Sequence, residues 1–298
     1  MVLIRGSEQE TEKVADLTYS SAARPQSIPS AVARSWLLVC AADPEALRRA
    51  DASDADVVVV DLEDGVADVD KDFARQQVHR RLHTGCPTWL RINDATTRHW
   101  SIDLDLLADT PTPAGVMLAK AESAEQVEAT AARLGNQVPI VPLIESAVGL
   151  ENVRAIAAAS LVRLAFGSGD FRRDTGAGAD PVALAYARSR LVVASRAERI
   201  SAPIDGPSLT DDLEELRADI KVGTSAGMAG KLCLTAAHAE PINTALSPST
   251  DDMAWARTLI DRLGEDGARI RSGSERPQLD RALKIKARAE FFGPWGAR

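Results

Sequence analysis

Charged side chains stand at the ends of five successive apolar runs. A single carboxylate after an apolar run is ordinarily a cap or a loop residue, so none of them indicates a site alone. Five consecutive charged ends are different, because gathering several carboxylates in one place is costly unless a cation or an arginine compensates them. In chain order these residues are Asp61, Glu63 and Asp64, then Arg91 with Asn93, then Lys120, then Glu145, and last Asp170.

These residue types favour a hard divalent cation, above all Mg²⁺, because carboxylate oxygens dominate the set. Mg²⁺ takes one or two protein carboxylates, keeps some waters and leaves positions for substrate oxygens. Glu145 and Asp170 are the expected direct ligands. Asp61, Glu63 and Asp64 are expected to orient the metal-bound water molecules by hydrogen bonds, without binding the metal themselves.

Two further features favour a small anionic substrate beside that ion. Arg91 can hold a carboxylate through two hydrogen bonds. The glycines of "FGSGD", Gly167 and Gly169, let backbone amides approach a ligand closely. A metal and an arginine that face an anionic carbonyl compound stabilise an enolate. The pattern therefore predicts chemistry that makes or breaks a carbon–carbon bond beside a carbonyl group.

The elements that precede these residues must bring them together. Eight short apolar runs alternate with longer stretches of helical period, and most runs are continuously apolar, as expected for parallel strands covered on both faces. This favours an α/β fold, a (β/α)8 TIM barrel, whose active site lies at the C-terminal strand ends. A doubly wound sheet usually has a Gly-rich turn after its first strand, whereas "AADPEAL" follows here. The runs span residues 35–40, 56–64, 88–93, 115–120, 139–146, 162–170, 201–206 and 230–235.

Composition divides the chain into three parts. Residues 1–30 are polar and are expected to be a flexible N-terminal arm. Residues 31–246 hold the eight units and are the expected catalytic domain. Residues 247–298 contain two helical stretches joined by "RSGSERP". They are expected to form a C-terminal helical extension that packs on the barrel or reaches a neighbouring subunit as a lid.

Global composition excludes several classes of function. The formal net charge of −8 argues against nucleic acid or an anionic membrane as partner. No apolar run approaches the roughly 18 residues of a membrane span, and the acidic N-terminus has no secretory pattern. A cytoplasmic location is the resulting expectation. The three cysteines, Cys40, Cys86 and Cys233, lack metal-binding spacing and are expected to be reduced.

Several motifs in register resemble one known family. "ARSWLLV", "ADVVVVDLEDGVA" followed by Lys71, "LRIN", "KAESAEQV", "LIESAVGL", "FGSGDFRRDTGA" and "YARSRLVVASRA" occur in family order between Arg34 and Ala282. The sequence resembles the HpcH/HpaI aldolase and citrate lyase family, near the citrate lyase beta subunit and the malyl-CoA and citramalyl-CoA lyases. The resemblance implies a TIM barrel assembled as trimers or hexamers, Mg²⁺ on Glu145 and Asp170, and substrate on Arg91.

The sequence departs from the family pattern at the rim of the predicted site. Pro-Gly after the first strand is replaced by Cys40-Ala41, and the residue before Lys120 is Ala119 rather than proline. His-Pro after the eighth strand is replaced by Thr235-Ala236. The family's Asp-x-Pro, which the resemblance places in a neighbour's site, corresponds to Glu275-Arg276-Pro277. A glutamate at 275 keeps a carboxylate that can act as acid or base.

Three functional hypotheses follow. The leading one is a Mg²⁺-dependent carbon–carbon lyase that cleaves or forms a 3-hydroxyacyl-CoA thioester, such as malyl-CoA or citramalyl-CoA, through an enolate. Arg91, Glu145 and Glu275 would be catalytic, and Lys120 and Gly169 would also bind substrate. A Schiff base on Lys120 is less favoured, because a lysine beside several carboxylates is expected to be their ion-pair partner. The alternatives are an aldolase on free 2-oxo acids and a catalytically impaired binding or regulatory paralogue.

Overall fold

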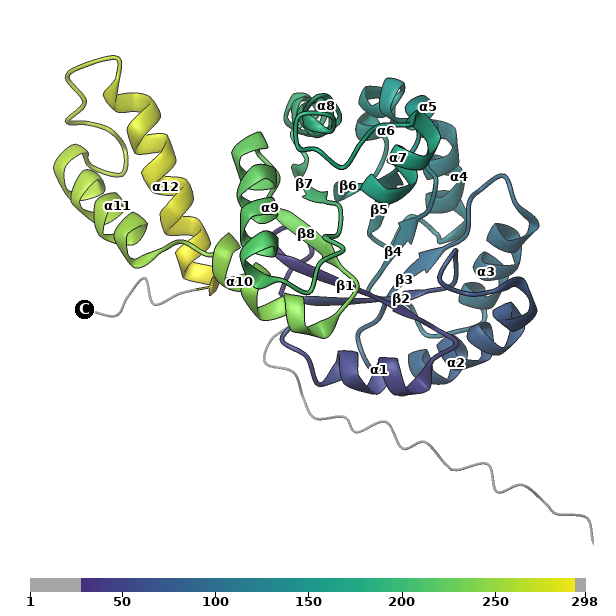
Figure 1. Cartoon of the computed structure of the whole chain (residues 1–298). Coiled ribbons are helices and arrows are strands. Elements are labelled where there is room, and N and C mark those ends of the chain that lie inside the picture. The colour runs from purple at the N-terminus through teal and green to yellow at the C-terminus, as the bar shows by residue number, and fades with distance from the viewer. Residues whose placement is uncertain (1–27, 293–298) are drawn as a thin grey trace, which may run out of the picture.

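Each of the eight apolar runs forms a parallel strand, and the strands close into a barrel in chain order (Figure 1). This computed structural model describes residues 28–292, and it confirms the predicted (β/α)8 barrel. The predicted N-terminal arm lies outside the described residues up to position 27. The strands are Ser35–Cys40 (β1), Val57–Asp61 (β2), Trp89–Ile92 (β3), Gly115–Leu118 (β4), Ile140–Ile144 (β5), Arg163–Phe166 (β6), Ser201–Asp205 (β7) and Gly230–Cys233 (β8).

Helices surround the barrel on its outside (Figure 1). Several begin at residues that cap them: Asp43 accepts hydrogen bonds from the first turn of α1, and Ser123 forms a capping box with Gln126 at the start of α4. The helices are Pro44–Asp51 (α1), Lys71–His83 (α2), Arg98–Ala108 (α3), Ala124–Arg133 (α4), Ala147–Glu151 (α5), Val153–Ala158 (α6), Ser168–Thr175 (α7), Ala185–Ala197 (α8), Leu213–Ala226 (α9), Ala239–Leu246 (α10), Thr250–Leu263 (α11) and Glu275–Phe292 (α12), with short 3-10 turns at Asp68–Asp70 (η1) and Ala236–His238 (η2).

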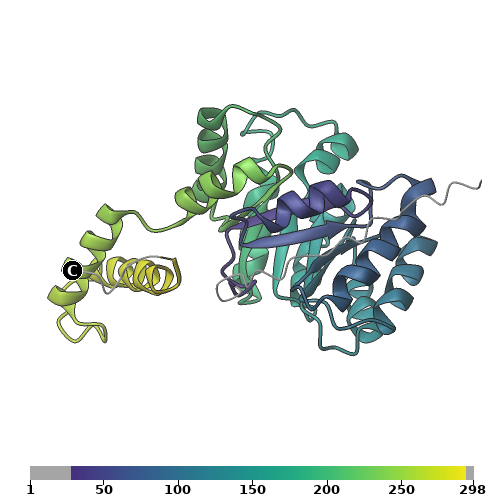
Figure 2. The same ribbon diagram turned by 90° about the horizontal axis from the view of Figure 1, so that it is seen from below.

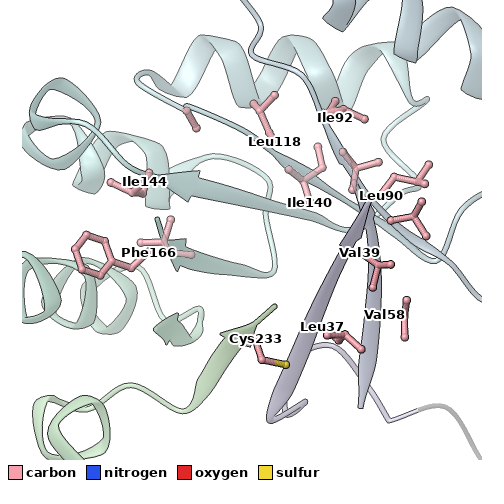
Figure 3. Packing of buried hydrophobic residues seen from close by; sticks show 14 of the residues in the cluster. Leu37, Val39, Val58, Leu90, Ile92, Leu118, Ile140, Ile144, Phe166 and Cys233 are labelled. Atoms are coloured by element: carbon pink, nitrogen blue, oxygen red, sulfur yellow. The ribbon is translucent and has the colours of Figure 1, made fainter. Parts of the chain in front are cut away.

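The continuous apolar runs are explained by two separate cores. Successive residues of a strand point to opposite faces, and both faces of these strands are covered. Val58 and Val60 of β2 belong to the core between strands and helices, whereas Val57 and Val59 belong to the core inside the barrel. Figure 3 shows the outer core, where Phe166 and its neighbours point from the strands toward the helices.

This alternation decides which charged residues face the mouth of the barrel. Asp61 continues the inward series of Val57 and Val59, and Arg91 follows inward-facing Trp89 by two positions. Glu145 follows the inward-facing Val141 and Leu143 in the same way. Asp61, Arg91 and Glu145 therefore face the same space at the mouth of the barrel. The inner core below them is filled by side chains such as Trp36 and Trp89, whose rings meet edge to face at 4.9 Å.

The predicted C-terminal helical extension is confirmed as a hairpin of α11 and α12 (Figures 1 and 2). The two helices have a small core of their own, which includes Leu259 and Leu279. Both views show the hairpin projecting from the side of the barrel. The end of α12 is attached near β1, where Phe292 lies 3.9 Å beneath the guanidinium of Arg34. Within residues 28–292, no helix is both long and apolar enough to cross a membrane.

Candidate active site

Arg91 and Asp61 form a buried ion pair at the mouth. Nε and Nη2 of Arg91 donate to the two carboxylate oxygens of Asp61, both at 2.6 Å. The carboxylate is itself held by the backbone amides of Glu63 at 2.9 Å and Gly65 at 3.0 Å. Because a paired geometry of this kind fixes the guanidinium plane, Asp61 determines where Arg91 points. The predicted role of Asp61 in orienting metal-bound waters stays a prediction.

Lys120 connects the carboxylates that follow β2. Its ammonium donates to Asp64 at 2.8 Å and to Glu63. Although burial lowers the pKa of Lys120, its hydrogen bonds to Asp64 and Glu63 raise that pKa above the ordinary value. The ammonium is therefore charged at neutral pH, as expected for an ion-pair partner and not for a Schiff-base amine.

Glu63 lies between the charged groups of Arg91 and Lys120, and its capacity to accept hydrogen bonds is only partly used. Its Oε2 is 3.2 Å from Nη1 of Arg91 in an ion pair, but among the described residues it has no hydrogen-bond partner. Burial raises the pKa of Glu63 by more than Arg91 and Lys120 lower it. Such an oxygen is suited to accept a hydrogen bond from a bound water or a substrate group.

Glu145 is the carboxylate with the most perturbed environment at the mouth. It is 4% exposed, and its Oε1 accepts a hydrogen bond from the backbone amide of Lys120 at 2.7 Å. Burial, together with the nearby charges of Glu63 and Asp170, raises its pKa to about 8, although Arg91 opposes this shift. A cation bound beside this carboxylate would favour its ionised form and lower its pKa.

Asp170 lies in the first turn of α7, next to the end of β6. Its side chain is 24% exposed and pairs with Arg173 at 3.2 Å. Its charge acts on Glu145, so the structure brings the two predicted metal ligands together. In the described part of the chain, no three His, Cys, Asp or Glu side chains form a ready-made metal cage. Two carboxylates fit the coordination habits of Mg²⁺, which takes one or two carboxylates from a protein.

Because Gly167 has no side chain, it leaves room for the side chain of Glu145. A Cβ at this position would stand 2.4 Å from Oε2 and 2.5 Å from Cβ of Glu145, which is too close for any real contact. We therefore expect Gly167→Ala to displace Glu145 and to weaken Mg²⁺ binding by at least about tenfold. Isothermal titration with Mg²⁺ measures this. Gly169→Ala is the control, because its Cβ meets nothing within 4 Å; equal losses in both variants would contradict the steric explanation.

A buried polar network behind the site was missed by sequence reasoning. The ammonium of Lys71 donates to the carbonyl oxygens of Leu62 and Glu63 and to Oδ1 of Asn93, at 2.8 to 2.9 Å. Asn93 in turn donates to Asp103 at 2.6 Å, and Asp103 is fully buried. This network holds the backbone after β2. Lys71 stands in a recognisable motif, but nothing in the local sequence distinguishes Asp103 from an exposed helix residue.

Glu275 lies in the first turn of α12, in the C-terminal hairpin that projects from the side of the barrel. One carboxylate oxygen accepts from the backbone amides of Arg271 at 2.7 Å and Ser272 at 3.1 Å, and the other accepts from Arg262 at 2.8 Å. Backbone hydrogen bonds from Arg271 and Ser272, with Arg262, lower its pKa. The carboxylate of Glu275 is thus bound to the loop that precedes its own helix and to Arg262 of α11. Proton transfer in a neighbouring subunit stays a prediction and requires exchange of these partners.

Comparison with known proteins supports one family for most of the chain. The profile of the HpcH/HpaI aldolase/citrate lyase family matches residues 34–236, and that of the HpcH/HpaI aldolase C-terminal domain matches residues 251–293. A citrate lyase subunit beta-like protein of Deinococcus radiodurans is 31% identical over 248 residues, which cover 78% of this chain and 86% of the relative. The human mitochondrial citramalyl-CoA lyase is 27% identical, over 82% of this chain and 78% of its own.

A solved structure agrees with both the barrel and the extension. CitE from Mycobacterium tuberculosis, in complex with magnesium, acetoacetate and coenzyme A, superimposes with a TM-score of 0.73 at 29% identity. The match covers 87% of this chain and 99% of that one. The chain described here is therefore a member of the HpcH/HpaI aldolase/citrate lyase family, a carbon–carbon lyase family on the (β/α)8 barrel.

Proposed function

We propose that this protein is a Mg²⁺-dependent lyase that cleaves a 3-hydroxyacyl-CoA thioester into a 2-oxo acid and a shorter acyl-CoA, or forms it. The observation that carries this proposal is the placement of buried Glu145 beside Arg91 in one barrel mouth. Malyl-CoA and citramalyl-CoA are the expected substrates to test first. The complexes of CitE with magnesium and acetoacetate or pyruvate, and of the citrate lyase beta subunit from M. tuberculosis with magnesium and oxaloacetate, support the proposal by analogy.

Glu145 and Asp170 are the residues that would hold Mg²⁺. Their carboxylates are close enough for the charge of Asp170 to raise the pKa of Glu145. Mg²⁺ supplies Lewis-acid polarisation of a carbonyl oxygen when it is bound. Glu63 and Asp64, which Lys120 holds in place, are suited to orient waters beside it.

Arg91 would bind the substrate carboxylate and stabilise the enolate. Its Nε and Nη2 are engaged by Asp61, and its Nη1 lies 3.2 Å from Oε2 of Glu63, so a substrate carboxylate would share the guanidinium with Glu63. A positively charged, fixed guanidinium in a buried mouth stabilises negative charge that develops during the reaction. In the cleavage direction a base takes the proton of the 3-hydroxyl group and the C2–C3 bond breaks. The released enolate then takes a proton at C2 to give the acyl-CoA.

Glu275 of a neighbouring subunit is the proposed group for that proton transfer, in a homo-trimer or hexamer. We expect Glu275→Gln to lower kcat by about 100-fold, since positioned acid–base groups contribute 10²–10⁴. Steady-state kinetics with a cleavable thioester measure the effect. Arg262→Met is the control, because it removes the ion-pair partner of Glu275 but leaves the carboxylate. Equal kcat values for Glu275→Gln and the unaltered protein would remove Glu275 from the mechanism.

The proposal is tested with a panel of 3-hydroxyacyl-CoA thioesters that includes malyl-CoA and citramalyl-CoA. Mass spectrometry follows release of the acyl-CoA and the oxo acid, with Mg²⁺ and with a chelator. Glu145→Gln serves as the metal-site control. Metal-dependent cleavage that the variant lacks is the expected result. Folded, Mg²⁺-bound protein that cleaves no thioester would refute the proposal. Activity on free 2-oxo acids instead would favour an aldolase, and inactivity on both would favour a binding or regulatory paralogue.

A further inference from the structure

A buried lysine, Lys71, holds the turn that follows β2. It is 5% exposed, and its ammonium donates to the carbonyl oxygens of Leu62 at 2.8 Å and Glu63 at 2.9 Å. Its third hydrogen bond, also at 2.9 Å, goes to Oδ1 of Asn93. All three acceptors are neutral, and within residues 28–292 the ammonium forms no ion pair. Because burying an ammonium without a carboxylate partner costs folding free energy, we expect this lysine to have a role besides stability.

The turn that Lys71 holds also carries the two backbone amides that bind Asp61. The carbonyl oxygen of Glu63 accepts a further hydrogen bond from the amide of Val66 at 2.9 Å, which closes the turn. Within the turn, the amide of Glu63 donates to Oδ1 of Asp61 at 2.9 Å, and that of Gly65 donates to Oδ2 at 3.0 Å. A Cβ at Gly65 would stand 2.2 Å from Oδ2, so this close approach of the backbone requires glycine.

One peptide group, between Leu62 and Glu63, connects Lys71 directly with Asp61. Its C=O accepts the hydrogen bond of Lys71, and its N–H donates to Asp61. The C=O and N–H of a trans peptide lie in one plane and point in opposite directions, so the plane is fixed from both sides. Hydrogen bonds in series also polarise one another. An ammonium on the C=O therefore makes the N–H of the same peptide a stronger donor.

Asp61 carries this orientation to the mouth of the barrel. Each of its carboxylate oxygens accepts one backbone amide and one N–H of Arg91. Because the two amides fix the carboxylate, its remaining acceptor directions fix Nε and Nη2 of Arg91, each at 2.6 Å. A displaced turn would therefore rotate the carboxylate and move the guanidinium with it.

We propose that Lys71 is a positioning residue, which holds the turn so that its two amides orient Asp61 and, through it, Arg91. This inference rests on the proposed function, in which Arg91 binds the substrate. Asn93 and Asp103 support the lysine from behind. Because the carboxylate of Asp103 can only accept, Nδ2 of Asn93 faces it at 2.6 Å, and Oδ1 of Asn93 is left to receive Lys71.

The first test compares the NMR signals of the Glu63 and Gly65 amides in the full-length protein and in Lys71→Met. Both amide protons should move upfield in the variant, because their hydrogen bonds to the carboxylate weaken. Lys231→Met is the matched control: Lys231 is 2% exposed and holds the carbonyl oxygen of Gly206 at 2.7 Å, so its loss should leave both signals unchanged. If Lys71→Met does not fold, Lys71→Gln replaces it; this variant keeps two donors without the charge and should give smaller shifts in the same direction. Unchanged signals in the folded variant would overturn the inference.

The second test is a double-mutant cycle on the cleavage of a thioester. Lys71→Met alone should lower kcat/KM by about tenfold or more. In the Asp61→Asn background the same replacement should lower it by less than about threefold, because members of one hydrogen-bond network do not contribute independently. Equal losses in both backgrounds would show that Lys71 does not act through Asp61 and would overturn the inference. If the unaltered protein cleaves no thioester, the proposed function has failed, and the amide signals still decide whether Lys71 orients the turn.

Discussion

Replacing Asp61 by Asn is expected to lower kcat/KM by about 100-fold or more while Mg²⁺ affinity stays within about twofold. The amide keeps the shape of the carboxylate but cannot accept both hydrogen bonds of Arg91, which are 2.6 Å long in the unaltered protein. A guanidinium that is free to rotate no longer meets the substrate in a fixed geometry. Breaking one partner of a buried ion pair should also cost about 3–5 kcal/mol of folding free energy.

The matched control for this variant is Asp56→Asn. Asp56 also binds an arginine through both carboxylate oxygens, with Nε and Nη2 of Arg34 each at 2.8 Å, but this pair precedes β2 at the opposite end of the barrel. Its loss should lower the melting temperature without changing kcat/KM. If both variants lose activity equally, Asp61 acts through stability alone. If Mg²⁺ binds more weakly to Asp61→Asn only, Asp61 serves the metal site as first predicted.

The second large effect is the dependence of Mg²⁺ affinity on pH. Because burial raises the pKa of Glu145 to about 8, we expect this carboxyl to be mostly protonated at pH 7 in the metal-free protein. Metal binding needs the ionised form, so each ion should displace about one proton. The association constant is therefore expected to rise close to tenfold per pH unit between about 6 and 8 and then to level off. Calorimetry in buffers with different ionisation enthalpies measures the released proton directly.

The folding stability of the metal-free protein should also depend on pH, and the direction of this dependence tests the same pKa shift. The pKa of Glu145 rises from 4.5 in the unfolded chain to about 8 in the folded one. Its contribution to folding stability is therefore fully present below about 4.5 and is lost as pH rises through about 8. Metal-free protein should melt at lower temperature at pH 9 than at pH 6, and Mg²⁺ should reduce this difference. Glu63→Gln should move the affinity transition to lower pH, because the charge of Glu63 raises the pKa of Glu145; a pH-independent association constant would contradict this account.

The fold was predictable because its signals are local. A parallel strand covered on both faces needs an unbroken apolar run, and every such run, from "SWLLVC" at β1 to "GKLC" at β8, became a strand. Closure in chain order then brought the strand ends together. For this reason the sequence alone was sufficient to place Arg91, Lys120 and Glu145 at one mouth. The prediction that the sixth strand ends at Asp170 was wrong, because β6 ends at Phe166 and Asp170 lies in the first turn of α7.

The partners of those residues depended on tertiary structure. Arg91 and Asp61 are 30 positions apart, and they meet because β2 and β3 pair in a register that sets them opposite each other. The fully buried Asp103 likewise has ordinary sequence neighbours. Its role follows from burial and from contacts with distant segments, which no local pattern encodes. The sequence by itself therefore determined the barrel and the types of residue at its mouth, whereas the tertiary structure decided which charges pair and how far burial raises the pKa of Glu145.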